Sequence, residues 1–337
     1  MQTSKAPKRT YMRGAALAAA LAFAALLAIS LLGGCTQQQP NSSEANAQGN
    51  QAAQASYTFT DDLGYEVEVK SINRVIACMG SFANIWELSG GTLIGATEDA
   101  TQDYALSSSQ VELIGDFAAP NLERIIALQP DFVIMTGAST GRDGAASQVN
   151  LREGLKASGI TVAYFNVTTF EDYLRMLRTC CDITGRDDLY EKNGASVQKQ
   201  IEAVKAQVPT RKAPTALLMT TYSGGTRVQN SSTMTGTMLS ELGVRNLADE
   251  HASLLKDFSL ESVIELNPDF ILVVPMGNDT TASLKNLEAA TEANPAWATL
   301  DAVKNKNYVI LDMRLFQYKP NANWGTSYQT LFDILYS

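Results

Sequence analysis

Histidine is almost absent from this chain of 337 residues, which contains only His251. A metal site built from several histidines is therefore excluded, and every histidine-based catalytic scheme has a single candidate. Charged residues are also scarce, at 18%, and their balance is acidic, with a net charge of −9. Nucleic-acid binding needs a clustered basic surface, so this balance argues against a nucleic-acid partner. We expect His251, in Ala-Asp-Glu-His-Ala-Ser, to be an exposed loop residue.

The first 34 residues have the pattern of a signal peptide. Four basic residues precede any acidic one, and the eighteen residues from Ala15 to Leu32 are apolar except for Ser30. A basic segment, an apolar segment and small residues before a cleavage point are typical of a secretory signal. The alternative is an uncleaved membrane anchor, since eighteen apolar residues reach the lower length limit for a span. Both interpretations place the rest of the chain outside the cytoplasmic membrane.

Residues 35–55 are expected to form a flexible linker. Positions 36–55 contain no aromatic residue and no Leu, Ile, Val or Met. Such a segment cannot bury enough apolar surface to offset the entropy lost on ordering. The folded part begins near Tyr57, where two alternating strands flank Asp-Asp-Leu-Gly and predict a β-hairpin.

Short apolar runs alternate with helical patterns through the rest of the chain, which predicts an α/β fold with mostly parallel sheets. We expect two Rossmann-like lobes, at 56–184 and 209–337. Between them, residues 185–208 carry apolar side chains at helical spacing and predict one long connecting α-helix.

A repeated unit is the most informative feature of the sequence. Residues 121–134 read Asn-Leu-Glu-Arg-Ile-Ile-Ala-Leu-Gln-Pro-Asp-Phe-Val-Ile, and residues 259–272 read Ser-Leu-Glu-Ser-Val-Ile-Glu-Leu-Asn-Pro-Asp-Phe-Ile-Leu. Each unit begins with a helix-capping residue and places a glutamate in the first turn, where the helix dipole favours it. A proline then ends the helix before a buried strand. Two lobes of the same design are therefore expected.

These features resemble the helical-backbone substrate-binding proteins of bacterial ABC importers. The resemblance covers residues 57–337. Within this range, segments 80–91, 115–117 and 294–304 also match the family. It implies the class III substrate-binding-protein architecture and a monomer without an intrinsic cofactor. It implies capture of a ferric siderophore and its delivery to an ABC permease dimer that works with a cytoplasmic ATPase. A haem or cobalamin receptor of the same family is the alternative.

The resemblance also gives roles to individual residues. Cys35 directly follows Leu-Gly-Gly and resembles the lipobox of bacterial lipoproteins. This implies a membrane anchor in which the thiol carries a diacylglycerol, with palmitate among the acyl groups. In the family, one surface glutamate per lobe docks with arginines of the permease, and the matching positions are Glu123 and Glu261. The alternative is that both are only favourable charges at helix N-termini.

Ligands of α/β sheets bind outside the carboxyl ends of the strands. Arginines there suit carboxylates of an anionic chelate, and aromatic and methionine side chains suit the flat or apolar parts of a macrocycle. We therefore expect a cleft lined by Met79, Phe82, Phe117, Thr136, Tyr222, Arg227, Met276, Arg314 and Tyr318. Haem stays open as a ligand because the sequence offers several candidate axial ligands, namely Tyr104, Tyr222, Tyr318, Met79 and Met276.

With Cys35 lipidated, three cysteines remain, an odd number for an exported protein. We expect Cys78, Cys180 and Cys181 to be buried free thiols. The alternative is a disulfide between Cys78 and either Cys180 or Cys181.

Enzymes are the main competing class. The sequence lacks Gly-x-Ser-x-Gly, His-Glu-x-x-His and the Gly-x-x-x-x-Gly-Lys-(Ser/Thr) phosphate loop. A secreted, lipid-anchored hydrolase that uses only carboxylates is not excluded by motif. We expect a binding protein that is not an enzyme. A scaffold that binds only protein is a third class, and it predicts no arginines and aromatics in a cleft.

Overall fold

The computed structural model describes residues 56–337, apart from 138–143, 211, 257–258, 278 and 293. The predicted signal peptide, the linker and the lipidation site Cys35 lie outside the described residues. Among the helices that are described, none is long and apolar enough to cross a membrane.

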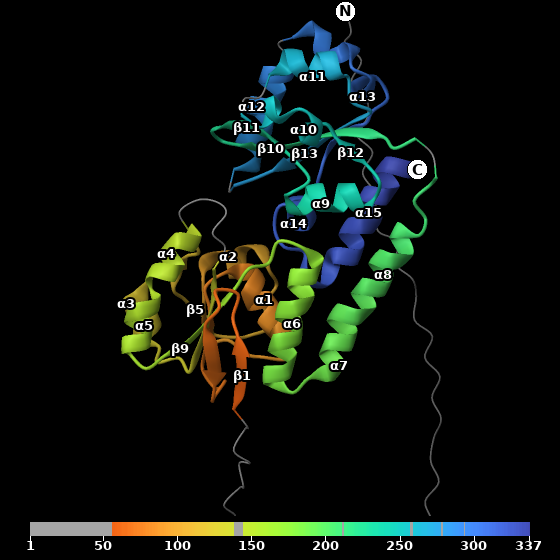
Figure 1. Ribbon diagram of the computed structural model, residues 1–337. Helices are drawn as coiled ribbons and strands as arrows, with labels where there is room; N and C mark the ends of the chain where they lie inside the picture. Colours follow the sequence, from red (N-terminus) through yellow and green to blue (C-terminus); the bar gives the residue numbers. More distant parts are fainter. Residues whose placement is uncertain (1–55, 138–143, 211, 257–258, 278, 293) are drawn as a thin grey trace, which may run out of the picture. The chain divides into compact units, whose positions relative to one another are not determined.

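The first lobe is built on a parallel sheet with the strand order β5-β4-β3-β8-β9 among its described residues. Figure 1 labels the two edge strands of this sheet, β5 and β9. The predicted hairpin of β1 and β2 is present beside it and is antiparallel. The elements of this lobe are β1 Tyr57–Thr60, β2 Glu66–Val69, β3 Val75–Ala77, α1 Gly80–Leu88, β4 Gly95–Ala96, α2 Glu98–Asp103, β5 Glu112–Leu113, β6 Gly115–Asp116, β7 Ala119–Pro120, α3 Leu122–Ala127, β8 Phe132–Thr136, α4 Gly144–Asn150, α5 Arg152–Ala157, β9 Thr161–Phe165 and α6 Phe170–Thr184.

The second lobe has the strand order β11-β10-β13-β14, and β12 lies beside the start of β10. Among the described strands of this sheet, only β11 is antiparallel to its neighbour, so the prediction of mostly parallel central sheets is confirmed. Its elements are β10 Thr215–Tyr222, β11 Gly225–Gln229, α9 Met234–Glu241, β12 Arg245–Asn246, α10 Leu247–Glu250, a 3₁₀-helix Ala252–Leu255, α11 Leu260–Leu266, β13 Phe270–Pro275, α12 Thr280–Glu292, a 3₁₀-helix Pro295–Thr299, α13 Asp301–Lys304, β14 Tyr308–Ile310, α14 Met313–Phe316, a 3₁₀-helix Asn321–Asn323 and α15 Trp324–Tyr336.

Alternation along the central strands divides each lobe into two apolar layers. On β8, Phe132 and Ile134 join one core, while Val133 and Met135 join another with residues of α3 and α5. The first core continues through α8 and α15 into the inner face of the second sheet. Because successive side chains of a strand point to opposite faces, a sheet covered on both sides needs nearly continuous apolar strands. The buried runs at β8, β10 and β13 meet that requirement.

The connector between the lobes is helical but not a uniform α-helix. α6 ends at Gly185, whose φ of 69° stops the helix in the left-handed region. The predicted helix over 185–208 corresponds to α7 Asp187–Tyr190, a π-helical turn Glu191–Ala195 and α8 Ser196–Lys205. The π-helical turn is packed tightly, because a Cβ on Gly194 would lie 3.2 Å from the Leu177 side chain. Tyr173 of α6 donates its hydroxyl to the Asn193 carbonyl at 2.7 Å and fixes this turn.

The two repeated units fold alike. Asn121 accepts a hydrogen bond from the Arg124 amide at 2.9 Å, and Ser259 accepts one from the Ser262 amide at 3.2 Å. Both N-caps expected from the sequence are therefore confirmed. The prolines that follow each helix, Pro130 and Pro268, lie before β8 and β13 as predicted.

The aspartate after each proline fastens the central strand to its neighbour. Asp131 accepts a hydrogen bond from the Arg74 amide at 3.0 Å, directly before β3. Asp269 accepts one from the Thr215 amide at 2.7 Å, at the start of β10. Each Pro-Asp pair therefore ends a helix and sets the register of two parallel strands.

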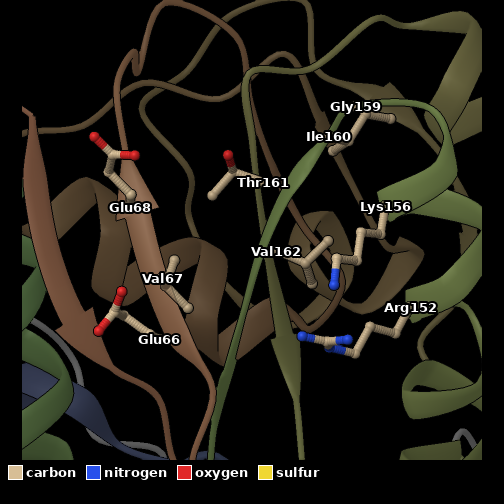
Figure 2. Close-up of a pocket in the computed structure, with 9 residues that line it drawn as sticks. All are labelled: Glu66, Val67, Glu68, Arg152, Lys156, Gly159, Ile160, Thr161 and Val162. Atoms are coloured by element: carbon tan, nitrogen blue, oxygen red, sulfur yellow. The ribbon is translucent and has the colours of Figure 1, made fainter.

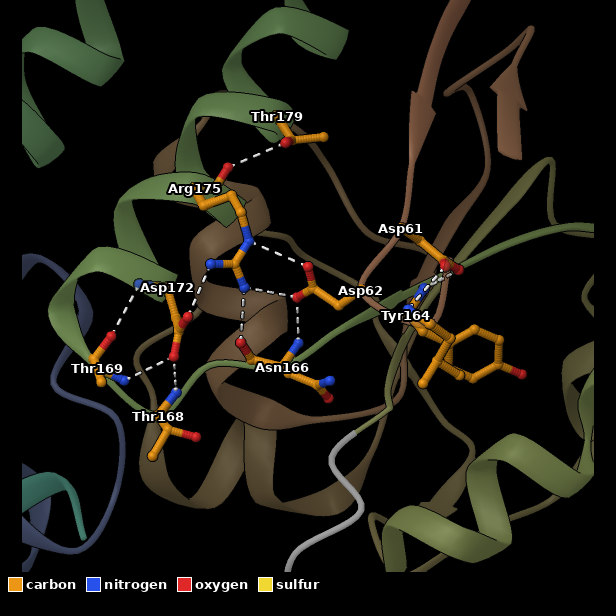
Figure 3. A network of polar contacts seen from close by, with 10 residues as sticks. Asp61, Asp62, Tyr164, Asn166, Thr168, Thr169, Asp172, Arg175 and Thr179 are labelled. Atoms are coloured by element: carbon orange, nitrogen blue, oxygen red, sulfur yellow. Dashed lines mark hydrogen bonds and ion pairs between the residues drawn. The ribbon is translucent and has the colours of Figure 1, made fainter. Parts of the chain in front are cut away.

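The β1–β2 hairpin is fastened to the first lobe by its turn aspartates (Figure 3). Asp61 accepts a hydrogen bond from the Tyr164 amide at 3.1 Å, and Asp62 accepts one from the Asn166 amide at 2.6 Å. Arg175 of α6 donates to both carboxylate oxygens of Asp62, at 3.1 and 2.9 Å, and to Asp172 at 2.8 Å. This bidentate pairing joins the hairpin, β9 and α6 in one polar network.

The Asp172 carboxylate gives this network a pH dependence. Partial burial opposes ionisation, but hydrogen bonds from Arg175 and the Thr168 and Thr169 amides lower the pKa of Asp172 below its usual value. Stability from such a carboxyl is present above its unfolded pKa of about 3.9 and is lost as pH falls through the folded pKa. We expect Asp172→Asn to cost about 1–2 kcal/mol of unfolding free energy at pH 7 and much less near pH 2.

Urea unfolding at both pH values measures this difference. The neighbouring exposed Glu171 provides the control, since Glu171→Gln is expected to change little at either pH. An equal loss for Asp172→Asn at the two pH values would contradict the assignment.

Candidate functional site

Four of the nine residues predicted to line a cleft lie at the carboxyl ends of parallel strands. Met79 stands between β3 and α1, and Thr136, which is buried, ends β8. Tyr222 ends β10, and Met276 follows β13. These four positions are at the edges where α/β sheets bind ligands. Phe117 lies between β6 and β7, an antiparallel pair outside the main sheet, and is 38% exposed.

Tyr222 and Arg227 contact each other. Arg227 lies on β11 opposite Thr220, and its Nε donates to the Tyr222 hydroxyl at 3.0 Å. Its guanidinium is 5.2 Å from the centre of the Tyr222 ring. Arg227 is therefore an exposed cation held in place by Tyr222.

Phe82 does not lie on an open surface. It is fully buried on α1, and its ring packs edge-on against Phe165 at 6.4 Å. The prediction that Phe82 lines the cleft is therefore wrong. The sequence shows that Phe82 follows β3 closely. It does not show which face of α1 packs against the core.

A buried glutamine joins the loops at this edge of the first lobe. Gln148 of α4 accepts a hydrogen bond from the Thr136 amide at 3.0 Å. Its amide group donates to the carbonyls of Cys78 and Phe117, both at 2.7 Å. Sequence reasoning missed Gln148, because a single glutamine on a short helix belongs to no motif.

Replacing Gln148 by leucine removes these three hydrogen bonds and leaves buried polar groups without their partner. We expect Gln148→Leu to lower the unfolding free energy by about 2–4 kcal/mol, measured by urea unfolding. The exposed Gln198→Leu is the matched control and is expected to change it by less than about 0.5 kcal/mol. Equal stability of the two variants would contradict a positioning role for Gln148.

The segment after α14 contacts the first lobe directly. Tyr104, which follows α2, donates its hydroxyl to the Lys319 carbonyl at 3.1 Å. The Asn321 amide group donates to the Ser81 carbonyl and to Asn84 Oδ1, both at 2.9 Å. Because Ser81 and Asn84 lie on α1, the lobes meet at the carboxyl ends of β3 and β4.

Ionisable groups gather at this junction. Asp99 of α2 accepts a hydrogen bond from the Gly80 amide at 2.7 Å through Oδ2, while its Oδ1 is buried without a partner. Burial and the nearby Asp99 raise the pKa of Asp103, against the influence of Tyr318 and Arg314. Burial lowers the pKa of Lys319 to about 8, and the Asp99 charge opposes that shift.

The junction also bears on the candidate haem ligands. Burial, together with Asp99 and Asp103, holds the pKa of the Tyr104 phenol far above its usual value, so this phenol stays protonated. The Tyr104 hydroxyl already donates a hydrogen bond to the Lys319 carbonyl, and this bond joins the two lobes. Burial and Asp103 also raise the pKa of Tyr318. Among the described residues, no three His, Cys, Asp or Glu side chains are placed to hold a metal ion.

Three cavities in the described part of the chain are lined by none of the predicted cleft residues. One of about 280 Å³ lies between β2 and the start of β9, with Arg152 and Lys156 on one side and Glu66 and Glu68 on the other (Figure 2). It is at the amino end of β9, the wrong end for a ligand by the strand rule. A larger one of about 520 Å³ lies beside Trp297 and β14. A third of about 410 Å³ lies between α8 and α15, which run side by side (Figure 1).

The remaining predicted residues are at the surface or in the core. Glu123 and Glu261 are exposed in the first turns of α3 and α11, and neither forms an ion pair with another described residue. Arg314 is exposed on α14, and His251 is exposed after α10, as expected for a loop histidine. The cysteines Cys78, Cys180 and Cys181 are buried and free, which confirms the favoured interpretation over a disulfide.

Comparison with known proteins identifies the family to which this chain belongs. Residues 76–315 match the family described as periplasmic binding protein. The chain belongs to this family. The Fe(3+)-citrate-binding protein YfmC of Bacillus subtilis is 24% identical over 285 residues, which cover 83% of this chain and 84% of that protein.

Solved structures of periplasmic binding proteins share the fold. The haem-binding protein HutB of Vibrio cholerae has a TM-score of 0.63 and 24% identity, over 79% of this chain and all of that one. Staphylococcus aureus SirA in complex with staphyloferrin B has a TM-score of 0.62 and 21% identity, over 83% of this chain and 97% of that one. This periplasmic binding protein therefore has the class III architecture expected from its sequence, and the relatives named above are binding proteins.

Proposed function

We propose that this chain is the extracytoplasmic receptor of an ABC importer and that it captures a ferric chelate of the siderophore type. The proposal is supported by the places of Met79, Tyr222 and Met276, which follow or end parallel strands of the two lobes, the ends at which α/β sheets bind ligands. The similarity to YfmC over most of both chains supports iron as the cargo. Haem and cobalamin are the alternative ligands within the family.

The proposal includes delivery to a permease dimer through Glu123 and Glu261. Both carboxylates are exposed, and both occupy the same position of a repeated unit. Two carboxylates on equivalent helices suit a partner made of two equivalent subunits, because charge complementarity sets the orientation of docking. ATP hydrolysis belongs to the cytoplasmic ATPase of the importer.

Anchoring by a lipid on Cys35 completes the proposal. The twenty residues after Cys35 give a tether that allows the folded lobes to reach a permease in the same membrane. One copy per permease dimer is sufficient, because each lobe supplies one docking glutamate.

A ligand panel tests the proposed function. The chain from Cys35 onward, purified from detergent-solubilised membranes, is titrated with ferric dicitrate, ferrichrome, haemin and cyanocobalamin. We expect a ferric chelate to change the tryptophan fluorescence saturably, and haemin and cyanocobalamin to leave their absorption spectra unchanged. If the haem or corrin spectrum shifts and ferric chelates give no response, the ligand is a tetrapyrrole rather than an iron chelate. No response to any of the four would contradict the proposed ligand class.

A further inference from the structure

Two aspartates of the β1–β2 hairpin bond to the edge of β9 at every second residue (Figure 3). Asp62 accepts the Asn166 amide at 2.6 Å, and Asp61 accepts the Tyr164 amide at 3.1 Å. Because the N–H groups of residues two apart point to the same edge of a strand, the Val162 amide also points toward the hairpin. No described residue accepts a hydrogen bond from it there, since β2 and β9 belong to separate sheets. The row of carboxylates along β9 therefore ends one place before Val162.

The cavity of about 280 Å³ lies where this row ends (Figure 2). Val162 lines it together with Thr161 of β9 and Val67 of β2. A backbone N–H is a strong donor that folded proteins pair with an acceptor, and here the described chain supplies none. At the two preceding places of this strand edge the acceptor is a carboxylate. A carboxylate brought by a ligand continues the same pattern.

Two cations lie on the α5 side of this cavity. Arg152 and Lys156 line it and extend from α5 toward β9 in Figure 2. The Arg152 guanidinium is held 3.5 Å from the centre of the Tyr65 ring, and its side chain is 20% exposed. Its ion pair with Glu153 is long, at 3.6 Å, and Lys156 forms no ion pair with any described residue. A stacked arginine, a lysine without a partner and the Val162 amide are together suited to bind an anionic group.

The opposite side of the cavity is acidic. Glu66 and Glu68 line it and are exposed on β2. Glu68 pairs with Lys70 at 3.1 Å, whereas Glu66 forms no ion pair with any described residue. Neither glutamate forms an ion pair across the cavity with Arg152 or Lys156. The glutamates repel a simple anion and the two cations repel a simple cation, so the cavity favours a ligand that carries both charges.

We infer that this cavity binds a small zwitterion of the α-amino-acid class. The ligand carboxylate accepts the Val162 amide and pairs with Arg152 and Lys156, while the ligand ammonium lies on the side of Glu66. A volume of about 280 Å³ is at the small end for ligand pockets, about 300–1,000 Å³, and suits a small ligand. The strand rule places the transported ligand at the carboxyl ends of the strands, whereas this cavity is at a strand edge near the amino end of β9. It is therefore a second site, and the inference does not depend on the proposed function.

Equilibrium dialysis of the chain from Cys35 onward against radioactive L-alanine tests the inference. We expect saturable retention of one L-alanine per chain, with a Kd of about 1 mM or tighter. Propionate has the same carbon skeleton without the ammonium, and ethylamine lacks the carboxylate. Each is expected to compete at least about tenfold less well than unlabelled L-alanine, because each is repelled by one side of the cavity. Competition by propionate equal to that of L-alanine would show a simple anion site and overturn the inference.

Two exposed residues assign the binding to this cavity. Lys156→Met and Glu66→Gln each remove one charge from one side, and each is expected to raise the Kd for L-alanine about threefold to tenfold. Lys199→Met and Glu171→Gln, exposed on other helices, are the matched controls and should leave the Kd within about 1.5-fold of the wild type.

Two outcomes contradict the inference. One is the absence of saturable retention up to about 50 mM L-alanine, and the other is a wild-type Kd in both cavity variants. Titration of the same variants with ferric dicitrate keeps the two proposals apart. Because neither Glu66 nor Lys156 is among the predicted cleft residues, binding of the chelate is expected to be unchanged whichever way the L-alanine test falls.

Discussion

Reversal of charge at both Glu123 and Glu261 is expected to abolish uptake of the chelated iron while leaving the affinity of the purified protein for its ligand unchanged. Both side chains are exposed in first helical turns, where no packing depends on them. The double variant Glu123→Lys and Glu261→Lys therefore places two cations where the proposed docking on arginines requires two carboxylates. Like charges across an interface cost several kcal/mol, so we expect uptake to fall to the level of cells without the receptor.

Radioactive iron uptake by cells, together with ligand titration of the purified variant, measures the two effects separately. Glu265→Lys is the matched control, because it is exposed on the same helix α11 but outside the first turn. It is expected to retain nearly full uptake. Normal uptake in the double variant would show that both glutamates are only favourable charges at helix N-termini.

Replacement of Cys35 by alanine is expected to release the protein from the membrane. In the proposed anchor the lipid is attached through the thiol, so Cys35→Ala removes the only attachment that a cleaved lipoprotein signal would provide. One acyl chain gives marginal membrane binding, whereas the several chains of a lipoprotein anchor give a stable one. We expect the variant to move from the membrane fraction to the soluble extracytoplasmic fraction, with loss of palmitate labelling.

Ser42→Ala, in the predicted linker, is the control and should stay in the membrane fraction with its label. If Cys35→Ala also stays in the membrane fraction, the apolar segment before it is an uncleaved anchor rather than a lipoprotein signal.

The sequence predicted the architecture well because the physical causes are local. Asn121 and Ser259 cap helices through their own side chains, and Pro130 and Pro268 end those helices through the geometry of their rings. The buried strands that follow are apolar throughout, since both faces of each sheet are covered. A repeat of these signals was enough to indicate two lobes of one design.

The site was predicted less well, because its decisive contacts join distant segments. Phe82 lies as near to β3 as the cleft residues do, yet it faces the core. Gln148 is placed among the loops by three hydrogen bonds to residues 12 to 70 positions away. Asn321 donates to the Ser81 carbonyl, 240 positions earlier, through packing of one lobe on the other. The spacing of residues in the sequence does not predict contacts between segments so far apart.

The central claim is that this periplasmic binding protein captures a ferric chelate, and equilibrium dialysis against ferric dicitrate and ferrichrome labelled with radioactive iron tests it most directly. The account predicts saturable retention of one iron complex per chain, with a Kd of about 1 μM or tighter, equivalent to about 8 kcal/mol of binding free energy. Iron retention no greater than that of the heat-denatured chain, with both chelates, would contradict it.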